Sequence, residues 1–248
     1  MSLPWKRFVA IGDSLTEGVG DPVRGGGLRG WADRLAQALR GVDPGLTYVN
    51  LARRGLRTDQ VRRTQLRAAL AAEPDLVAAL MGTNDLLDPA FEPARFEEEL
   101  DAVIRPLTDG GALVLTATFA DLTAFSPLPS RLKSRVRERL EEASEVVRTV
   151  SKRYDTLCVD AAEFPDKLER QIISLDRLHP SPHGHILLAQ LFAKLLEVRS
   201  GTPIPMPDPP QVAGKLLQAR WLIRQLDPIE VARHVWRFSL APRRRTSS

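Results

Sequence analysis

Short apolar runs alternate along this chain with longer segments in which apolar residues recur every three or four positions. The short runs have the length of buried strands and lie at 7–11, 48–52, 76–81, 112–119 and 156–159. The longer segments have the periodicity of helices and lie at 31–39, 58–72, 95–107 and 131–153, with a last one beginning at Ser181-Pro182. Alternating strands and helices form parallel sheets with helices on both faces. The sequence therefore predicts an α/β fold built on a five-stranded parallel sheet.

The chain length and a proline-rich stretch predict one domain with an extension. A chain of 248 residues is long enough to bury one large hydrophobic core. Residues 201–210, Gly-Thr-Pro-Ile-Pro-Met-Pro-Asp-Pro-Pro, contain too much proline for a helix or a central strand. We therefore expect a domain at 1–200, an extended linker at 201–210 and a C-terminal extension at 211–248.

The C-terminal extension carries the excess positive charge. The net charge of the chain is +4, yet residues 211–248 hold eight basic and two acidic side chains, so the rest is slightly acidic. Spaced apolar residues in the extension predict one or two basic amphipathic helices. We expect them to pack on the body or to join copies of the chain into a homo-oligomer. Contact with a membrane surface is the second interpretation, and we do not expect nucleic-acid binding.

Composition excludes several classes of protein. Hydrophobic residues make up 43% and charged residues 27% of the chain, ordinary values that indicate neither a disordered nor a membrane-embedded chain. Cys158 is the only cysteine, which excludes an internal disulfide and a cysteine-built zinc site. Its apolar neighbours predict a buried thiol. No signal-peptide pattern follows Met1, so we expect a cytoplasmic protein.

Five polar or glycine positions follow predicted strands or precede the last helix. They are Ser14, Gly55, Asn84, Asp176 and His179. Because parallel strands present their carboxyl ends at one edge of the sheet, we expect these residues to gather there. A serine hydroxyl acts as a nucleophile only with an imidazole to take its proton and a carboxylate on the other ring nitrogen. The sequence offers all three groups, with backbone and amide N–H donors beside them.

Each of these residues also has a structural interpretation. Ser14 alone could simply cap a turn, Asn84 could close a strand-to-helix turn, and Asp85 fits a helix cap better than a catalytic role. His183, His185 and His234 are rivals of His179, but only His179 has a carboxylate three residues earlier in a turn that proline bounds. His183 and His185 resemble a metal pair without a third ligand, so packing at the helix start is favoured.

Four blocks of this sequence, in order, resemble those of the SGNH or GDSL hydrolases. The blocks are Gly12-Asp13-Ser14-Leu15, Gly55, Gly82-x-Asn84-Asp85 and Asp176-x-x-His179-Pro180, and the resemblance spans residues 6–199. It implies a flavodoxin-like three-layer α/β/α fold. It also implies Ser14 as nucleophile, His179 as base and Asp176 as its orienting acid, with Ser14, Gly55 and Asn84 as oxyanion-hole donors. Members of this family cleave many esters and thioesters, so the resemblance indicates the reaction more than the substrate.

The resulting functional hypothesis is a GDSL-type serine esterase or acylhydrolase of the lipase and esterase kind. It needs no cofactor and no metal, and its substrate is a small-molecule or lipid ester. An acyltransferase or a thioesterase using the same site is one alternative. The other is a non-catalytic binding or scaffold domain that the basic extension recruits.

Other motifs give weaker evidence of a function. Gly25–Gly30 matches a dinucleotide-binding string but follows no strand, and Ser14 lacks the second glycine of a Gly-x-Ser-x-Gly elbow. The loops at 20–30 and 120–130 lie beside the expected site. Phe119, which directly precedes the second loop, and Leu122 and Phe125 within it are candidate walls of an acyl or alcohol pocket, although ordinary loop packing explains them equally well.

Overall fold

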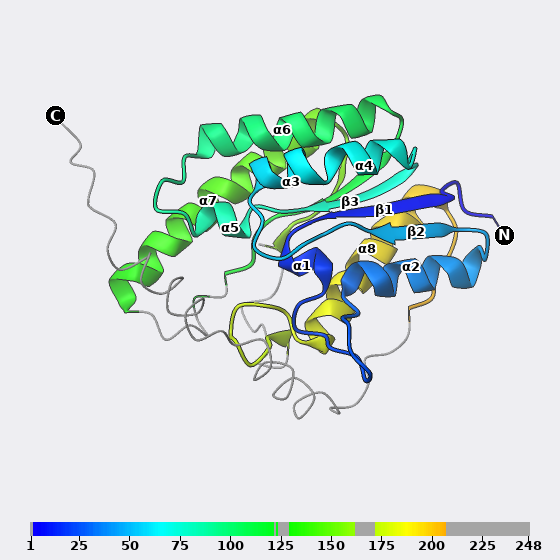
Figure 1. Ribbon diagram of the computed structural model, residues 1–248, viewed down its shortest axis with the longest axis horizontal. Coiled ribbons are helices and arrows are strands. Elements are labelled where there is room, and N and C mark those ends of the chain that lie inside the picture. The colour runs from blue at the N-terminus through cyan, green and yellow to red at the C-terminus, as the bar shows by residue number, and fades with distance from the viewer. Residues whose placement is uncertain (1, 122, 124–128, 162–171, 207–248) are drawn as a thin grey trace.

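A computed structural model describes residues 2–121, 123, 129–161 and 172–206 and confirms the predicted three-layer α/β/α fold (Figure 1). The parallel sheet has five strands in the order β2-β1-β3-β4-β5. The strands are β1 (Arg7–Gly12), β2 (Thr47–Asn50), β3 (Leu76–Leu80), β4 (Leu113–Ala117) and β5 (Leu157–Val159). The helices are α1 (Ser14–Glu17), α2 (Trp31–Val42), α3 (Thr58–Thr64), α4 (Leu66–Ala71), α5 (Thr83–Leu86), α6 (Pro93–Asp109), α7 (Ser130–Arg153) and α8 (Pro182–Ser200).

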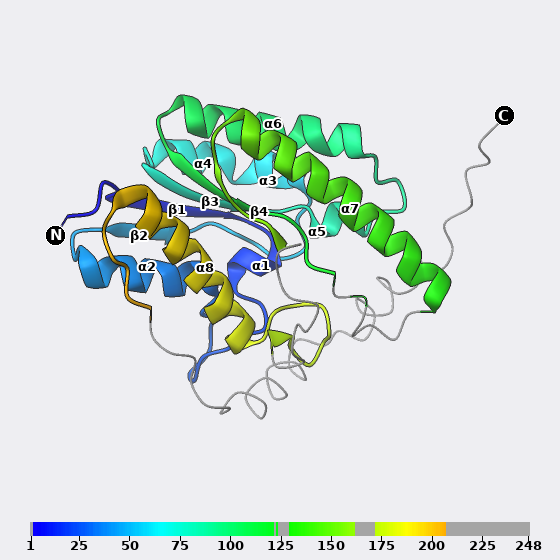
Figure 2. The same ribbon diagram turned by 180° about the vertical axis from the view of Figure 1, so that it is seen from behind.

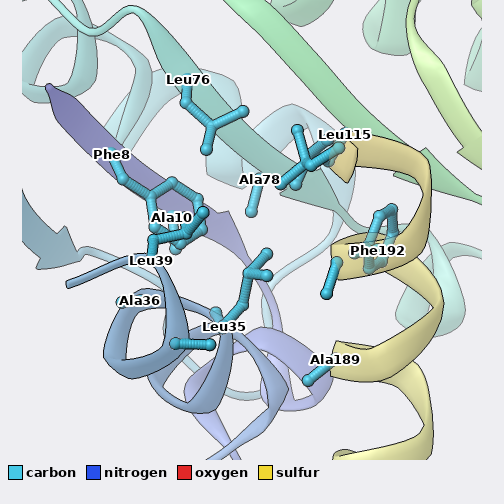
Figure 3. Packing of buried hydrophobic residues seen from close by; sticks show 14 of the residues in the cluster. Phe8, Ala10, Leu35, Ala36, Leu39, Leu76, Ala78, Leu115, Ala189 and Phe192 are labelled. Atoms are coloured by element: carbon cyan, nitrogen blue, oxygen red, sulfur yellow. The ribbon is translucent and has the colours of Figure 1, made fainter. Parts of the chain in front are cut away.

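Alternate residues of the central strands enter two separate cores. On one face of β1, Phe8 and Ala10 pack with residues of α2 and α8; on the other, Val9 and Ile11 pack with residues of α3, α4, α6 and α7. The two sets of helices lie on opposite faces of the sheet (Figure 2). Figure 3 shows the first core, where Phe192 of α8 approaches the sheet beside residues of α2. The strand period of two thus supplies side chains to both layers.

Two expectations about individual elements are wrong in detail. The second strand was expected to be buried, but β2 is an edge strand whose residues are exposed or half-buried, because only β1 pairs with it. The expected apolar face of α8 is right for Ile186 and Leu196, which are buried, but it also included Leu187, Leu191 and Leu195, which are half-buried. The buried face is centred instead on Ala189 and Phe192, because Phe192 stacks on Trp31 of α2 with ring centroids 4.7 Å apart.

The predicted helix at 58–72 divides at Gln65. Backbone hydrogen bonds continue across the division, from Gln65 to Val61 and from Ala69 to Gln65, so the distortion is local. The Gln65 side chain is only 4% exposed and pairs with the peptide of Gly12 at the end of β1. Its Nε2 donates to the Gly12 carbonyl at 2.9 Å, and its Oε1 accepts from the Gly12 N–H at 2.8 Å. Gln65 therefore occupies the place of a further strand residue at the carboxyl end of β1.

The start of the predicted linker packs on the domain. Ile204 is 2% exposed in the first core, and its N–H donates to Glu197 Oε1 at 2.7 Å. Residues 207–248 lie outside the described residues, so the remainder of the linker and the amphipathic extension stay predictions. Within the described ranges, no helix combines the length and the apolar character that a membrane span requires. Cys158 is half-buried rather than buried, in the short edge strand β5.

We expect Gln65→Leu to lower the free energy of unfolding by about 1–3 kcal/mol, because it leaves the buried polar groups of Gly12 without their side-chain partner. Gln37→Leu on the exposed side of α2 is the matched control and should change stability by less than about 0.5 kcal/mol. Urea unfolding of both variants measures the difference. Equal stabilities would contradict a structural role for the Gln65 amide.

Candidate active site

Ser14 lies at the turn between β1 and α1. Gly12 adopts φ +140°, and a Cβ there would lie 2.0 Å from the Leu80 carbonyl oxygen, so only glycine fits this end of the strand. Asp13 caps α1, its Oδ1 accepting from the Leu15 N–H at 3.1 Å. Ser14 is the first residue of the helix, where the backbone N–H has no partner within the helix. Its side chain is 8% exposed at the carboxyl edge of the sheet.

His179 joins Ser14 to Asp176. The His179 Nε2 lies 2.9 Å from the Ser14 Oγ, and its Nδ1 lies 2.8 Å from Asp176 Oδ2. All three side chains are buried or half-buried. The structure therefore brings together the predicted nucleophile, base and acid in the order that proton transfer from serine requires.

The turn before α8 fixes the carboxylate and the imidazole. Asp176 Oδ1 accepts from Ser174 Oγ at 2.6 Å and from the His179 N–H at 3.0 Å. Arg177, between them, adopts φ +60°, a strained conformation for a residue with a side chain. A backbone bond from Ser174 N to the His179 carbonyl at 2.8 Å closes the turn. Burial raises the pKa of Asp176, but its hydrogen bonds, chiefly that with His179, outweigh burial and hold the pKa well below the usual range.

Gly55 and Asn84, the other predicted oxyanion donors, lie on neighbouring loops. Gly55 has φ +79°, and within the described chain its N–H donates no hydrogen bond. The Asn84 Nδ2 donates to the Leu56 carbonyl at 3.0 Å and lies 3.5 Å from Asp13 Oδ2. The first contact fixes the amide against the Gly55 loop. The second is at the outer limit of a hydrogen bond and is the weaker of the two.

Two carboxylates, Asp13 and the half-buried Asp85, lie among these loops. Asp13 is almost fully buried, and burial raises its pKa to about 6. Burial also raises the pKa of Asp85 to about 6, although hydrogen bonds from the Thr58 N–H and hydroxyl oppose the shift. The expected capping role of Asp85 is confirmed, but the helix that it caps is α3 and not its own α5. Asp85 thereby ties the Asn84 turn to the segment that follows Gly55.

The other histidines of the sequence have different positions. His185 is buried at the start of α8, where its Nδ1 accepts from the Trp31 N–H at 3.2 Å and its Nε2 donates to the Val19 carbonyl at 2.9 Å. Both ring nitrogens are occupied, so the packing interpretation of His185 is confirmed. In the described ranges no three His, Cys, Asp or Glu side chains gather as a metal site would require. His234 lies outside the described residues.

A cavity of about 290 Å³ adjoins the reactive groups, and both Ser14 and His179 line it. Phe119, one predicted wall, is on its lining; Leu122 and Phe125 lie outside the described residues.

The sequence interpretation missed two supporting side chains, Gln65 and Ser174. Gln65 falls in line with the buried Val61 and Ala69 at helical spacing, and a polar residue on an apolar helix face is a signal that could have found it. Ser174 precedes Asp176 by two residues, a spacing that carries no such signal.

The buried imidazole of His185 makes stability depend on pH. Burial lowers its pKa from 6.5 to about 4, so as the pH falls below 6.5 the unfolded chain binds a proton before the folded one does. We expect stability to fall between pH 6.5 and 4 by up to about 3 kcal/mol from this group. His185→Gln removes this dependence and leaves Asp13 and Asp85 in place.

The stability difference between wild type and H185Q should therefore shrink as the pH falls from 6.5 to 4 and stay constant above 7. Urea unfolding at a series of pH values measures it. Parallel stability curves would contradict a neutral buried His185.

Known proteins resemble this chain over most of its length. The model of the GDSL-like lipase/acylhydrolase family matches residues 10–187. An acetylxylan esterase of Geobacillus stearothermophilus is 25% identical over 212 residues, 76% of this chain and 93% of that protein.

Solved structures share the fold. That of Axe2, an acetylxylan esterase from Geobacillus stearothermophilus, matches with a TM-score of 0.64 at 20% identity, covering 79% of this chain and 95% of its own. A lipase/acylhydrolase from Enterococcus faecalis matches with a TM-score of 0.62 at 21% identity, covering 84% of this chain and 100% of its own. Since the family model spans more than half of the sequence, the chain belongs to the GDSL-like lipase/acylhydrolase family.

Proposed function

We propose that this protein hydrolyses carboxylic esters through an acyl-enzyme on Ser14, with His179 as general base and Asp176 orienting it. The observation that carries the proposal is the continuous contact from Ser14 Oγ to His179 Nε2 at 2.9 Å and from His179 Nδ1 to Asp176 Oδ2 at 2.8 Å.

The chemistry follows from these contacts. As Ser14 Oγ attacks the ester carbonyl carbon, its proton passes to His179 Nε2, and Asp176 stabilises the imidazolium that forms. The carbonyl oxygen becomes an oxyanion that accepts from the N–H groups of Ser14 and Gly55 and from the Asn84 amide. The intermediate then collapses, the ester C–O bond breaks, and His179 returns the proton to the leaving alcohol. Water, activated by His179, cleaves the acyl-enzyme and releases the carboxylic acid.

The relatives support the same assignment. Solved structures of Axe2 include catalytic mutants in which a serine, an aspartate or a histidine is replaced by alanine. In that protein the aspartate precedes the histidine by three residues, which is the spacing of Asp176 and His179 here. The name of Axe2 gives an acetyl ester of xylan as its substrate. At 20% sequence identity this specificity belongs to Axe2 and is not transferred to the present chain.

We expect Ser14→Ala to lower kcat for p-nitrophenyl ester hydrolysis by up to about a millionfold, because no other hydroxyl replaces the nucleophile. Asp176→Asn, which leaves the imidazole without its acid partner, should lower kcat by about ten-thousandfold. A fluorophosphonate should label wild-type Ser14 and spare S14A, as peptide mass spectrometry would show. A folded wild-type protein that neither turns over nor labels at Ser14 would favour the binding-domain alternative.

Asn84→Ala should lower kcat by about a hundred- to a thousandfold with little change in KM, since the amide meets the oxygen only when charge develops on it. Thr64→Ala, at an exposed end of α3 away from the site, is the control and should leave kcat unchanged. Steady-state kinetics on p-nitrophenyl acetate separates kcat from KM. A rise in KM alone would contradict the oxyanion role of Asn84.

A further inference from the structure

We propose that the cavity beside Ser14 binds the acyl group of the substrate and selects esters with an apolar chain of about eight carbons over acetyl esters. This inference rests on the proposed function, because it assigns a substrate class to the same site.

The position of the cavity makes it the acyl side of the reaction. Ser14 and His179 line it, so a group bound there reaches the reacting atoms. It extends from them toward α5 and α7, which lie side by side beyond the carboxyl edge of the sheet in both views (Figures 1 and 2). The predicted oxyanion donors Gly55 and Asn84 are not on its lining. A carbonyl whose oxygen faces those donors can therefore extend its acyl chain into the cavity.

The lining is apolar. The side chains that form the walls are large hydrocarbons from four separate elements, namely Leu86 of α5, Phe119 after β4, Val136 and Leu140 of α7, and Leu187 of α8. Leu178, which is 41% exposed in the turn that carries His179, also lines the cavity.

The cationic group that α7 contributes does not favour an anionic ligand. Arg139 Nη1 donates to the carbonyls of Leu86 at 3.0 Å and Asp88 at 2.8 Å, and its Nη2 donates to the Pro89 carbonyl at 3.0 Å. The guanidinium is therefore bound to the end of α5 and the loop after it. The Thr123 hydroxyl, also on the lining, is neutral and cannot balance a ligand charge. The second arginine on the lining, Arg177, is exposed in the turn that carries His179, so its charge lies at the solvent. The remaining walls fit a hydrocarbon chain better than a sugar or a carboxylate.

The volume sets the length of chain. A cavity of about 290 Å³, at roughly 30 Å³ for each group of the size of a water molecule, holds about eight to ten methylenes. An acetyl group would fill only a small part of this space and leave most of the apolar wall unburied. Each methylene transferred from water to such a wall favours binding by about fourfold. Chain length should therefore change the specificity constant by orders of magnitude.

The test compares p-nitrophenyl acetate, butyrate, octanoate and palmitate, each below the concentration at which it forms micelles. We expect kcat/KM of the wild type to rise by at least about a hundredfold from acetate to octanoate. Palmitate, with twice as many carbons as octanoate, should gain nothing further.

Val136→Trp fills the cavity from α7, and Glu138→Trp, two residues away and exposed, is the matched control. V136W should lose at least about tenfold in kcat/KM on octanoate and keep its rate on acetate, while E138W keeps the wild-type profile. Thermal unfolding checks that both variants fold. If V136W does not fold, the wild-type profile alone decides the proposal.

The outcomes separate this inference from the proposed function. Cleavage of acetate that depends on Ser14, with a flat or falling profile toward octanoate, would overturn the acyl cavity and leave ester hydrolysis intact. An equal loss on both esters in a folded V136W would overturn it too. No cleavage of any ester by the wild type would overturn the proposed function itself.

Discussion

The parallel order of the strands is the constraint on which the site depends. All five strands end at one edge, so residues far apart in sequence meet there. Two neighbours in the sheet, β1 and β3, carry the turns of Ser14 and Asn84. The chain leaves β1 through α2 on one face and leaves β3 through α6 on the other. Their connections therefore diverge and leave a crevice between the two turns, the usual ligand position in open α/β sheets.

The topology brings the loops of the site close together, and hydrogen bonds between these loops then fix their positions. Gln65 holds the peptide of Gly12, and Asn84 and Asp85 hold the segment around Gly55 through Leu56 and Thr58. Burial of Asp13 and Asp85 disfavours their charged forms, which is why both pKa values rise to about 6. N–H donors that are held in place before the reaction are the arrangement that stabilises a developing oxyanion without reorganisation.

The strands, and the edge at which Ser14, Asp176 and His179 meet, could be predicted from the sequence because those signals are local. Buried strands have continuous apolar runs in the sequence. Because a parallel sheet places the carboxyl ends of its strands at one edge, this pattern was enough to predict that Ser14 lies near His179. Burial on an edge strand depends on which strands pair with it, and so β2 was misjudged. The buried face of α8 depends on its partner Trp31. The positive φ of Arg177 depends on the closing bond from Ser174. Each of these features depends on tertiary contacts, which the local sequence pattern does not indicate.

The surfaces around Ser14 differ in polarity and burial, and this difference bears on which part of an ester is selected. If the carbonyl oxygen meets the donors of the Gly55 and Asn84 loops, and the acyl chain enters the apolar cavity, the leaving group must point to the remaining side. Arg177 and Leu178 line the cavity as well and are exposed, so a leaving group beside them stays in contact with solvent. Exposed side chains lose little solvent contact when an alcohol binds and discriminate weakly. A buried apolar wall discriminates by every methylene that it covers. On this geometry the acyl group, and not the alcohol, determines which ester reacts.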